Sequence, residues 1–208
     1  MHYLAPDYIY TPQGFQPGML LSLSADGHIV SLAKRSSQPD LPSISLTLLP
    51  NTLLLPGFVN AHSHIFQRAL RGHTHRPLSS QDTFWSWRNA MYAAAQRLSP
   101  DTLYEMALPA YREMLAAGYT TVGEFHYVHH QPDGRPYANP NAMAEAVLSA
   151  GHDAGIRVIL LMSAYAQGGI NQPLEEGQRR FGDASVDAYL ARVDALRVSG
   201  VPVGLAPH

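Results

Sequence analysis

Residues 54–67 read LLPGFVNAHSHIFQ, an apolar run that ends at two histidines one residue apart, His62 and His64. We interpret the run as a buried β-strand beginning near residue 53, because it is short, apolar and broken only by a Pro-Gly turn signal. Side chains at positions i and i+2 of a strand point to the same face. The two imidazoles are therefore predicted to project together from the carboxyl end of the strand.

The sequence after Leu53 alternates strand-like and helix-like segments. Three helical segments stop at a glycine that leads into an apolar strand, at Gly118, Gly155 and Gly200, and glycine readily adopts the left-handed conformation that ends a helix. Strands are predicted near 53–60, 120–126, 156–162 and 201–206, and helices from Ser99 to about 115, from Asn139 to about 150 and from about 185 to 198, the last with a stripe of Val186, Tyr189, Leu190, Val193 and Leu196. This order predicts an α/β fold with a parallel sheet or barrel.

Residues 1–53 have a different pattern, with short β-like runs at 20–23, 28–30 and 43–48 and turn signals at Asp26-Gly27 and Pro39-Asp40. No helix is evident there, and the pattern predicts a small antiparallel β unit. We therefore expect two domains, residues 1–53 and residues 54–208.

The composition excludes several classes of protein and of site. The 208 residues are 46% hydrophobic with a formal net charge of −2, so no excess charge indicates nucleic acid or an anionic membrane as a partner. The N-terminus shows no signal peptide and no apolar stretch is long enough to span a membrane, so a cytoplasmic location is expected. The chain has no cysteine, so any metal must be held by nitrogen and oxygen ligands.

The context of His62 and His64 favours a metal site. Barrels of the α/β class place their active sites at the carboxyl ends of the strands, and paired neutral imidazoles suit Zn²⁺ or Fe²⁺. A second pair, His73 and His75, lies in the polar stretch RGHTHRPLSSQD, which we interpret as a solvated loop.

At residues 54–64 the string LLPGFVNAHSH resembles the strand-one metal motif of the amidohydrolase superfamily, whose members are metal-dependent (β/α)8 TIM-like barrels. Residues 1–53 are similar to the N-terminal part of the small β-sandwich domain that such enzymes carry. Four longer strings resemble the branch that deiminates formimidoylglutamate, namely HSHIFQRALRG, FWSWRNAMY, AGYTTVGEFHYVHH and EEGQRRF.

The resemblance implies a role for six residues of this chain. His62 and His64 would be two ligands of one catalytic zinc ion per subunit, with Fe²⁺ as an alternative, and the substrate-binding positions would be Gln67, Arg88, Tyr127 and His208. The implied reaction is hydrolysis of N-formimidoyl-L-glutamate to N-formyl-L-glutamate and ammonia, a step of histidine degradation. A guanidinium suits this dicarboxylate, because it can grip a carboxylate with two charge-assisted hydrogen bonds.

In this superfamily the third histidine ligand, the metal-binding aspartate and the proton-transfer residues come from strands five to eight. By this resemblance they lie beyond His208, so no catalytic residue is expected within residues 1–208. We expect a truncated barrel with about four β/α units, inactive alone, and a homodimer for the complete protein.

Several residues have a plainer interpretation. Gln67 could begin a helix, Arg88 could stack on Trp85 or Trp87 at the surface, and Tyr127 could be half-buried with its hydroxyl bonded. Other polar residues are expected to be structural. Glu124 would be either an interior carboxylate paired with a neighbour or a group that supports the site residues from behind. His126, His129 and His130 would be shell or loop residues, and Arg179 and Arg180 would solvate a loop. Two other functions also fit, a deaminase or chlorohydrolase acting on an aminated heterocycle such as guanine, and a non-catalytic remnant that binds a ligand.

Overall fold

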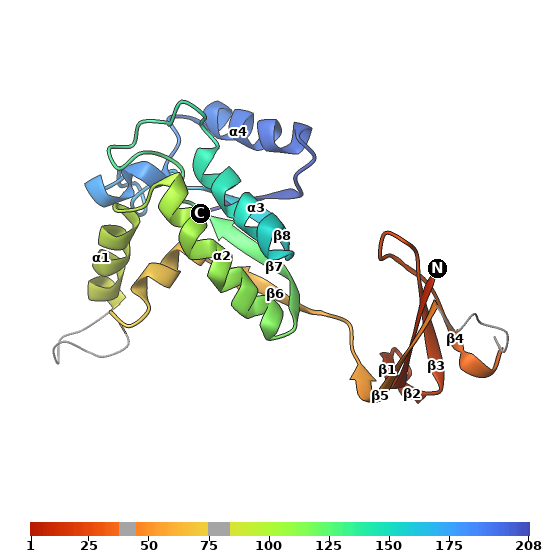
Figure 1. Ribbon diagram of the computed structural model, residues 1–208. Helices are drawn as coiled ribbons and strands as arrows, with labels where there is room; N and C mark the ends of the chain where they lie inside the picture. The colour runs from red at the N-terminus through yellow and green to blue at the C-terminus, as the bar shows by residue number, and fades with distance from the viewer. Residues whose placement is uncertain (38–44, 75–83) are drawn as a thin grey trace. The chain divides into compact units, whose positions relative to one another are not determined.

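A computed structural model describes residues 1–37, 45–74 and 84–208 (Figure 1). The chain divides into two compact units, Met1–Pro56 and Gly57–His208. Within the described residues, no helix is long and apolar enough to cross a membrane.

The first unit is a five-stranded sheet made of β1 (His2–Thr11), β2 (Gly14–Pro17), β3 (Met19–Leu23), β4 (Ile29–Lys34) and β5 (Leu46–Leu54). β1 pairs antiparallel with β2 and β3, and β3 pairs antiparallel with β4. The prediction of an antiparallel unit is wrong for β5, which pairs with β1 in parallel. β1 and β2 were not predicted, and a short 3₁₀ turn, η1 (Arg35–Ser37), is present where no helix was expected.

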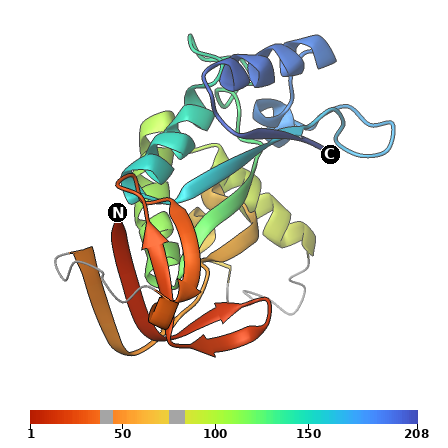
Figure 2. The same ribbon diagram turned by 90° about the vertical axis from the view of Figure 1, so that its right-hand side faces the viewer.

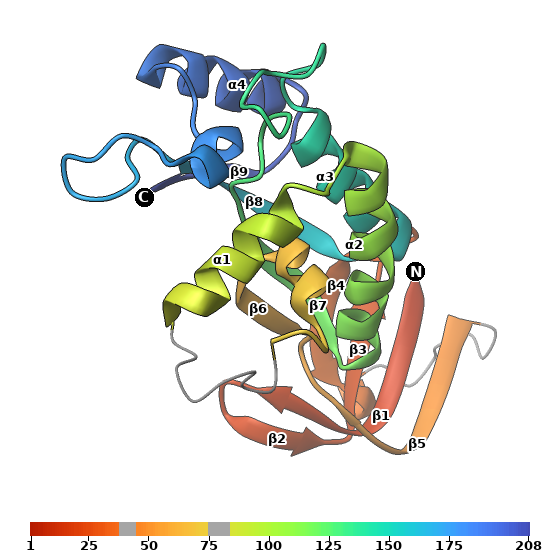
Figure 3. The same cartoon turned by 90° about the vertical axis from the view of Figure 1, so that its left-hand side faces the viewer.

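The second unit contains a four-stranded parallel sheet in the order β6 (Phe58–Ser63), β7 (Tyr119–His126), β8 (Arg157–Ala164) and β9 (Val203–Pro207). The prediction of four parallel strands is confirmed. The first strand begins at Phe58, because Leu53 and Leu54 belong to β5 of the other unit and Pro56, which has no N–H to donate, lies between the two strands. In Figures 2 and 3 the end of β9 lies beside the loop that follows β8.

Among the described residues of this unit, four α-helices accompany the sheet: α1 (Phe84–Ala95), α2 (Pro100–Ala116), α3 (Ala142–Ala154) and α4 (Val186–Val198), with two 3₁₀ segments, η3 (Ile65–Leu70) and η4 (Glu176–Phe181). α2 starts as predicted, with the Ser99 hydroxyl accepting from the Thr102 N–H at 3.2 Å. α3 begins at Ala142, three residues after the predicted start at Asn139, and its N-cap is Asn141. α1 was not predicted.

The glycines expected at three helix ends adopt the expected backbone conformation. Gly118, Gly155 and Gly200 have φ values of +89°, +85° and +84°. Each chain reversal delivers the next strand, β7, β8 or β9, to the same sheet in the same direction. The strand ends that carry polar residues therefore meet at one edge.

The core of this unit lies between the sheet and the helices α2 and α3, which pack side by side along it (Figures 1 and 3). Val122, Leu160 and Met162 of the sheet are fully buried, as are Leu103 and Met143 of the two helices. The stripe predicted for α4 is partly wrong: Tyr189, Val193 and Leu196 are buried, whereas Val186 and Leu190 are exposed.

Candidate functional site

The two histidine rings meet at the carboxyl end of β6. His62 is the last residue but one of the strand, and His64 directly follows the strand. Their Nε2 atoms are 3.1 Å apart, and the ring planes are nearly perpendicular, at 88°. The side chains therefore converge on one point, as the period of a strand predicts.

The backbone around these histidines is irregular and held by neighbouring side chains. The pairing of β6 with β7 shifts register between Asn60 and Ser63, and such irregularities often lie next to active sites, where they re-aim a side chain. The Asn60 side chain accepts from the His62 N–H at 3.2 Å. Ile65 directly follows His64, and its N–H donates to the buried carboxylate of Glu124 at 2.7 Å.

Burial raises the pKa of Glu124 to about 7, against the lowering effect of the Ile65 N–H. Glu124 is thus the interior carboxylate that the sequence predicted, and its contact is with the backbone that follows the second histidine.

The histidine pair fits a divalent metal ion. His64 Nδ1 is 2.9 Å from the carbonyl oxygen of Phe125, and since a carbonyl only accepts, Nδ1 carries the proton. Burial lowers the pKa of His64, so the neutral ring is favoured, with its lone pair on Nε2. Two nitrogens bound to one Zn²⁺ at ~2.0–2.1 Å lie roughly 3–3.5 Å apart, close to the observed separation. A carbonyl on the other ring nitrogen is also the usual support of a metal-binding histidine.

A cavity of about 530 Å³ opens over this pair. All six residues expected at the site line it: His62, His64, Gln67, Arg88, Tyr127 and His208. They come from the ends of β6, β7 and β9 and from η3 and α1, so the fold collects them from segments far apart in the sequence.

The Arg88 guanidinium projects from α1 into this cavity. Its carbon lies 4.5 Å from the centre of the Trp85 ring and 5.4 Å from that of Tyr92, so the stacking that the plainer interpretation expected does occur. The side chain is nevertheless only 21% exposed. Its Nη2 is 3.4 Å from Glu175 Oε1, and its Nε has no hydrogen-bond partner among the described residues.

Gln67 and Tyr127 form a pair inside the cavity. The Gln67 Nε2 donates to the Tyr127 hydroxyl at 3.0 Å. Burial raises the pKa of Tyr127 to about 12, so the hydroxyl stays protonated near neutral pH and remains a donor. Gln67 lies within η3, a 3₁₀ segment rather than the α-helix that the plainer interpretation expected.

Two residues near this cavity were not singled out from the sequence: Tyr165, which lines it, and Gln178, which bonds to tyrosines of the lining. The ring of Tyr165 stacks on that of His208, with centres 4.3 Å apart and planes at 19°. The buried Gln178 donates to the hydroxyls of Tyr92 and Tyr165 at 2.9 and 3.3 Å. Its position inside the string EEGQRRF was the only sequence signal for this contact.

Arg180 is fully buried, so the prediction that it solvates a loop is wrong. Its guanidinium donates to the carbonyl of Ala95, the last residue of α1, to that of Leu98 just after the helix, and to that of His130. The carbonyl end of a helix carries partial negative charge, which offsets the cation in place of a carboxylate. Arg179 is exposed, as expected.

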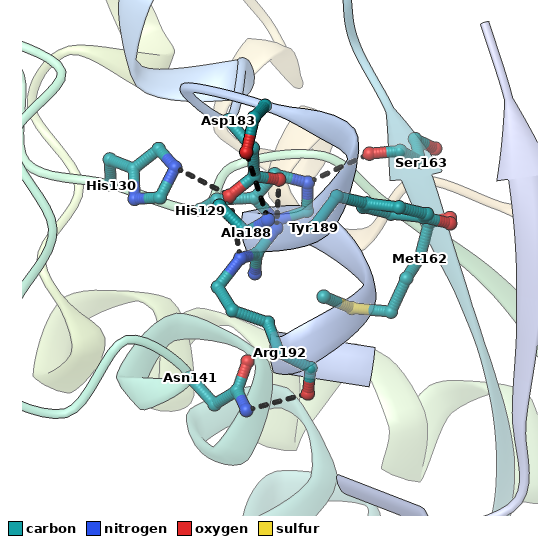
Figure 4. Close-up of polar contacts among 10 residues, drawn as sticks. His129, His130, Asn141, Met162, Ser163, Asp183, Ala188, Tyr189 and Arg192 are labelled. Atoms are coloured by element: carbon teal, nitrogen blue, oxygen red, sulfur yellow. Dashed lines mark hydrogen bonds and ion pairs between the residues drawn. The ribbon is translucent and has the colours of Figure 1, made fainter. Parts of the chain in front are cut away.

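His126, His129 and His130 are buried and none lines the cavity. His129 is 2.9 Å from the Ser163 carbonyl, and His130 is 3.2 Å from Asp183, which also pairs with Arg192 at 2.6 Å (Figure 4). Although burial opposes it, hydrogen bonds from His130 and Arg192 lower the pKa of Asp183. This network joins α4 to the strand ends.

Of the second histidine pair, His73 is exposed and His75 lies outside the described residues.

A model of the amidohydrolase family matches residues 53–208. The chain belongs to the amidohydrolase family. The resemblance inferred from the motif at β6 is therefore confirmed.

Individual relatives give finer similarities. The chain is 40% identical over 202 residues to formimidoylglutamate deiminase of Pseudomonas aeruginosa, covering 95% of this chain and 43% of that protein. It is 28% identical over 213 residues to 8-oxoguanine deaminase of the same organism, covering 97% of this chain and 44% of that protein.

Solved structures share the fold. An amidohydrolase from Brucella melitensis superposes with a TM-score of 0.87 at 32% identity, over 100% of this chain and 45% of that chain. An atrazine chlorohydrolase from Arthrobacter aurescens, complexed with zinc, gives 0.73 at 22% identity, over 100% and 46%. The chain thus spans less than half the length of these relatives.

Proposed function

We propose that this amidohydrolase sequence provides the metal-binding and substrate-binding part of a hydrolase that deiminates N-formimidoyl-L-glutamate, giving N-formyl-L-glutamate and ammonia. The observation that carries the proposal is one cavity containing both a converging imidazole pair and the Arg88 guanidinium. The 40% identity to a formimidoylglutamate deiminase supports the same substrate.

In this proposal the cation at Arg88 holds one carboxylate of the substrate. Its Nε lacks a partner among the described residues and its Nη2 has only long contacts, of 3.4 and 3.5 Å to Glu175. The guanidinium therefore has donors free for a two-pronged carboxylate contact. Stacking on Trp85 and Tyr92 fixes its plane before the ligand arrives, which limits the entropy lost on binding.

The polar pair Gln67 and Tyr127 orients the substrate between Arg88 and the histidines. The Tyr127 hydroxyl accepts from Gln67 and has a proton to donate. His208, stacked on Tyr165 at the end of β9, closes the cavity on the far side.

His62 and His64 would hold the metal through Nε2. Bound there, a zinc ion would supply Lewis-acid chemistry, activating a water molecule near neutral pH for attack on the formimidoyl carbon. Zinc is the ion we propose, since an atrazine chlorohydrolase of the same fold is complexed with it and imidazole nitrogens suit it.

We further propose that residues 1–208 alone do not turn over substrate. Within residues 1–37, 45–74 and 84–208, no group of three His, Asp or Glu side chains is placed to hold a metal ion. A catalytic zinc site has three protein ligands in addition to water or substrate, and the histidine pair supplies two.

Ammonia release tests the substrate, and it is measured on the zinc-loaded full-length hydrolase of which residues 1–208 are proposed to form a part. We expect kcat/KM for N-formimidoyl-L-glutamate to exceed that for guanine and 8-oxoguanine by at least about 10³-fold, since a site built for charged groups rejects ligands that lack them. A preference for a purine would instead support the heterocycle deaminase that the second relative represents.

A paired substitution then tests the carboxylate contact. Arg88→Ala is expected to lower kcat/KM for the dicarboxylate by about 10²-fold, the loss of a strong charged hydrogen bond. The matched control is Arg97→Ala, an exposed arginine just after α1 that does not line the cavity. An equal effect of both changes would contradict the assignment of Arg88.

A further inference from the structure

A carboxylate of the protein itself lies beside the Arg88 guanidinium. The Glu175 oxygens are 3.4 and 3.5 Å from Arg88 Nη2, whereas a charge-assisted hydrogen bond is typically ~2.7–2.9 Å long. The Glu175 side chain is 56% exposed, against 21% for Arg88. The pairing is therefore loose and is open to solvent on the side of the glutamate.

The position of Glu175 is nevertheless built into the structure. Its backbone N–H donates at 2.7 Å to the side-chain oxygen of Gln178, which is 1% exposed. The same Gln178 amide donates to the hydroxyl of Tyr92, which lies four residues after Arg88 on α1. Since residues four apart share one face of a helix, Gln178 brings Glu175 to the face of α1 that carries Arg88.

Arg88 does not depend on Glu175 for its orientation. The rings of Trp85 and Tyr92 lie on the guanidinium at 4.5 and 5.4 Å, and both come from α1 itself. The main effect of Glu175 on Arg88 is therefore to balance its charge, because the aromatic rings already orient the guanidinium.

We propose that Glu175 is a resident carboxylate that pairs with Arg88 when no ligand is bound and that the carboxylate of a substrate displaces it. This inference rests on the proposed function, because it takes Arg88 as the carboxylate-binding group. Glu175 then sets a threshold for binding. To bind, a ligand must carry a carboxylate whose interaction with the guanidinium is stronger than the long, solvent-exposed contact of Glu175. Neutral heterocycles and weakly bound anions are therefore disfavoured.

The test removes the charge of Glu175 and measures dicarboxylate binding. Glutarate is the probe, and its Kd is measured by calorimetry on the zinc-loaded full-length hydrolase, as the wild type and with Glu175→Gln or Glu176→Gln. Glu176 is the matched control, an exposed neighbour that neither lines the cavity nor pairs with Arg88 in the described part of the chain. Glu175→Gln is expected to lower the Kd about three- to tenfold, through loss of an exposed ion pair and of repulsion between like charges. Glu176→Gln is expected to leave it unchanged.

Two further readouts separate displacement from a purely structural role. The advantage of Glu175→Gln should shrink as salt rises from 0.05 to about 0.5 M, because salt screens the exposed charge. With N-formimidoyl-L-glutamate, Glu175→Gln in the full-length hydrolase should lower KM by a similar factor and leave kcat within about twofold.

The outcomes distinguish this inference from the proposed function. A tighter glutarate complex without deiminase activity supports the role of Glu175 and contradicts the proposed substrate. Deiminase activity with an unchanged or higher Kd in Glu175→Gln overturns the role of Glu175 and leaves the proposed function standing. Absence of glutarate binding in both proteins overturns both.

Discussion

Replacing Arg180 by methionine should destabilise the second unit by about 3 kcal/mol. The change removes the buried guanidinium that donates to Ala95, Leu98 and His130. Ala95 O keeps the Leu98 N–H as a partner, so two carbonyls lose the donor that the structure gives them. A buried polar group left unsatisfied costs ~1–3 kcal/mol. The charge no longer needs to be desolvated, which offsets part of the cost of those two groups.

Urea unfolding followed by tryptophan fluorescence measures this loss. Both tryptophans of the chain, Trp85 and Trp87, lie on α1 in the second unit, so the signal reports the part of the protein that Arg180 holds. Arg179→Met is the matched control, because that neighbour is exposed, and it should change the free energy of unfolding by less than about 0.5 kcal/mol. A cost below about 1 kcal/mol for Arg180→Met would refute the argument from unsatisfied carbonyls.

Three further predictions concern stability. Burial lowers the pKa of His126 to about 3, so below pH ~6.5 this histidine is protonated in the unfolded chain but neutral in the folded one. Its contribution to the free energy of unfolding is therefore complete above pH ~6.5 and falls by about 2 kcal/mol by pH 5. His126→Gln should reduce the loss of stability between pH 7 and pH 5 by this amount in urea titrations. Asp183→Asn leaves Arg192 buried without its counter-charge and should cost about 3–5 kcal/mol, whereas the exposed Asp194→Asn should cost under about 0.5 kcal/mol; equal costs would contradict the role of the network. Ser99→Ala removes the N-cap of α2 and should lower the unfolding free energy by about 1 kcal/mol, while an unchanged midpoint would show that the cap contributes nothing.

The sequence predicted those features that depend on local pattern. The start of α2 follows from Ser99 and Pro100, and the helix ends follow from Gly118, Gly155 and Gly200, since caps and left-handed glycines are chemical properties of a few adjacent residues. The convergence of the two imidazoles follows from the period of a strand.

Features that depend on distant segments escaped prediction. The parallel pairing of β5 with β1 joins residues about 43 apart, and no pattern within either strand specifies its partner's direction. The burial of Arg180 depends on carbonyls supplied by the end of α1 and by the loop after β7. α1 escaped prediction because its residues, FWSWRNAMYAAA, begin with bulky aromatics, which have low helix propensity.

The hydrogen bonds between Gln178 and two tyrosines of the cavity lining are another tertiary feature. Tyr92, Tyr165 and Gln178 come from α1, the end of β8 and η4, and their contacts appear only once these segments are folded together. The family motifs predicted the residues that would contact substrate, but they did not predict the residues that support those side chains.

The central claim is that His62 and His64 aim at one cation in a cavity where Arg88 holds a carboxylate. A crystal structure with zinc and glutarate, with anomalous difference density recorded at the zinc edge, tests it most directly. The account predicts a single strong peak about 2.0–2.1 Å from both Nε2 atoms and a glutarate carboxylate on the Arg88 guanidinium. Zinc bound elsewhere, or glutarate bound away from Arg88, would contradict it.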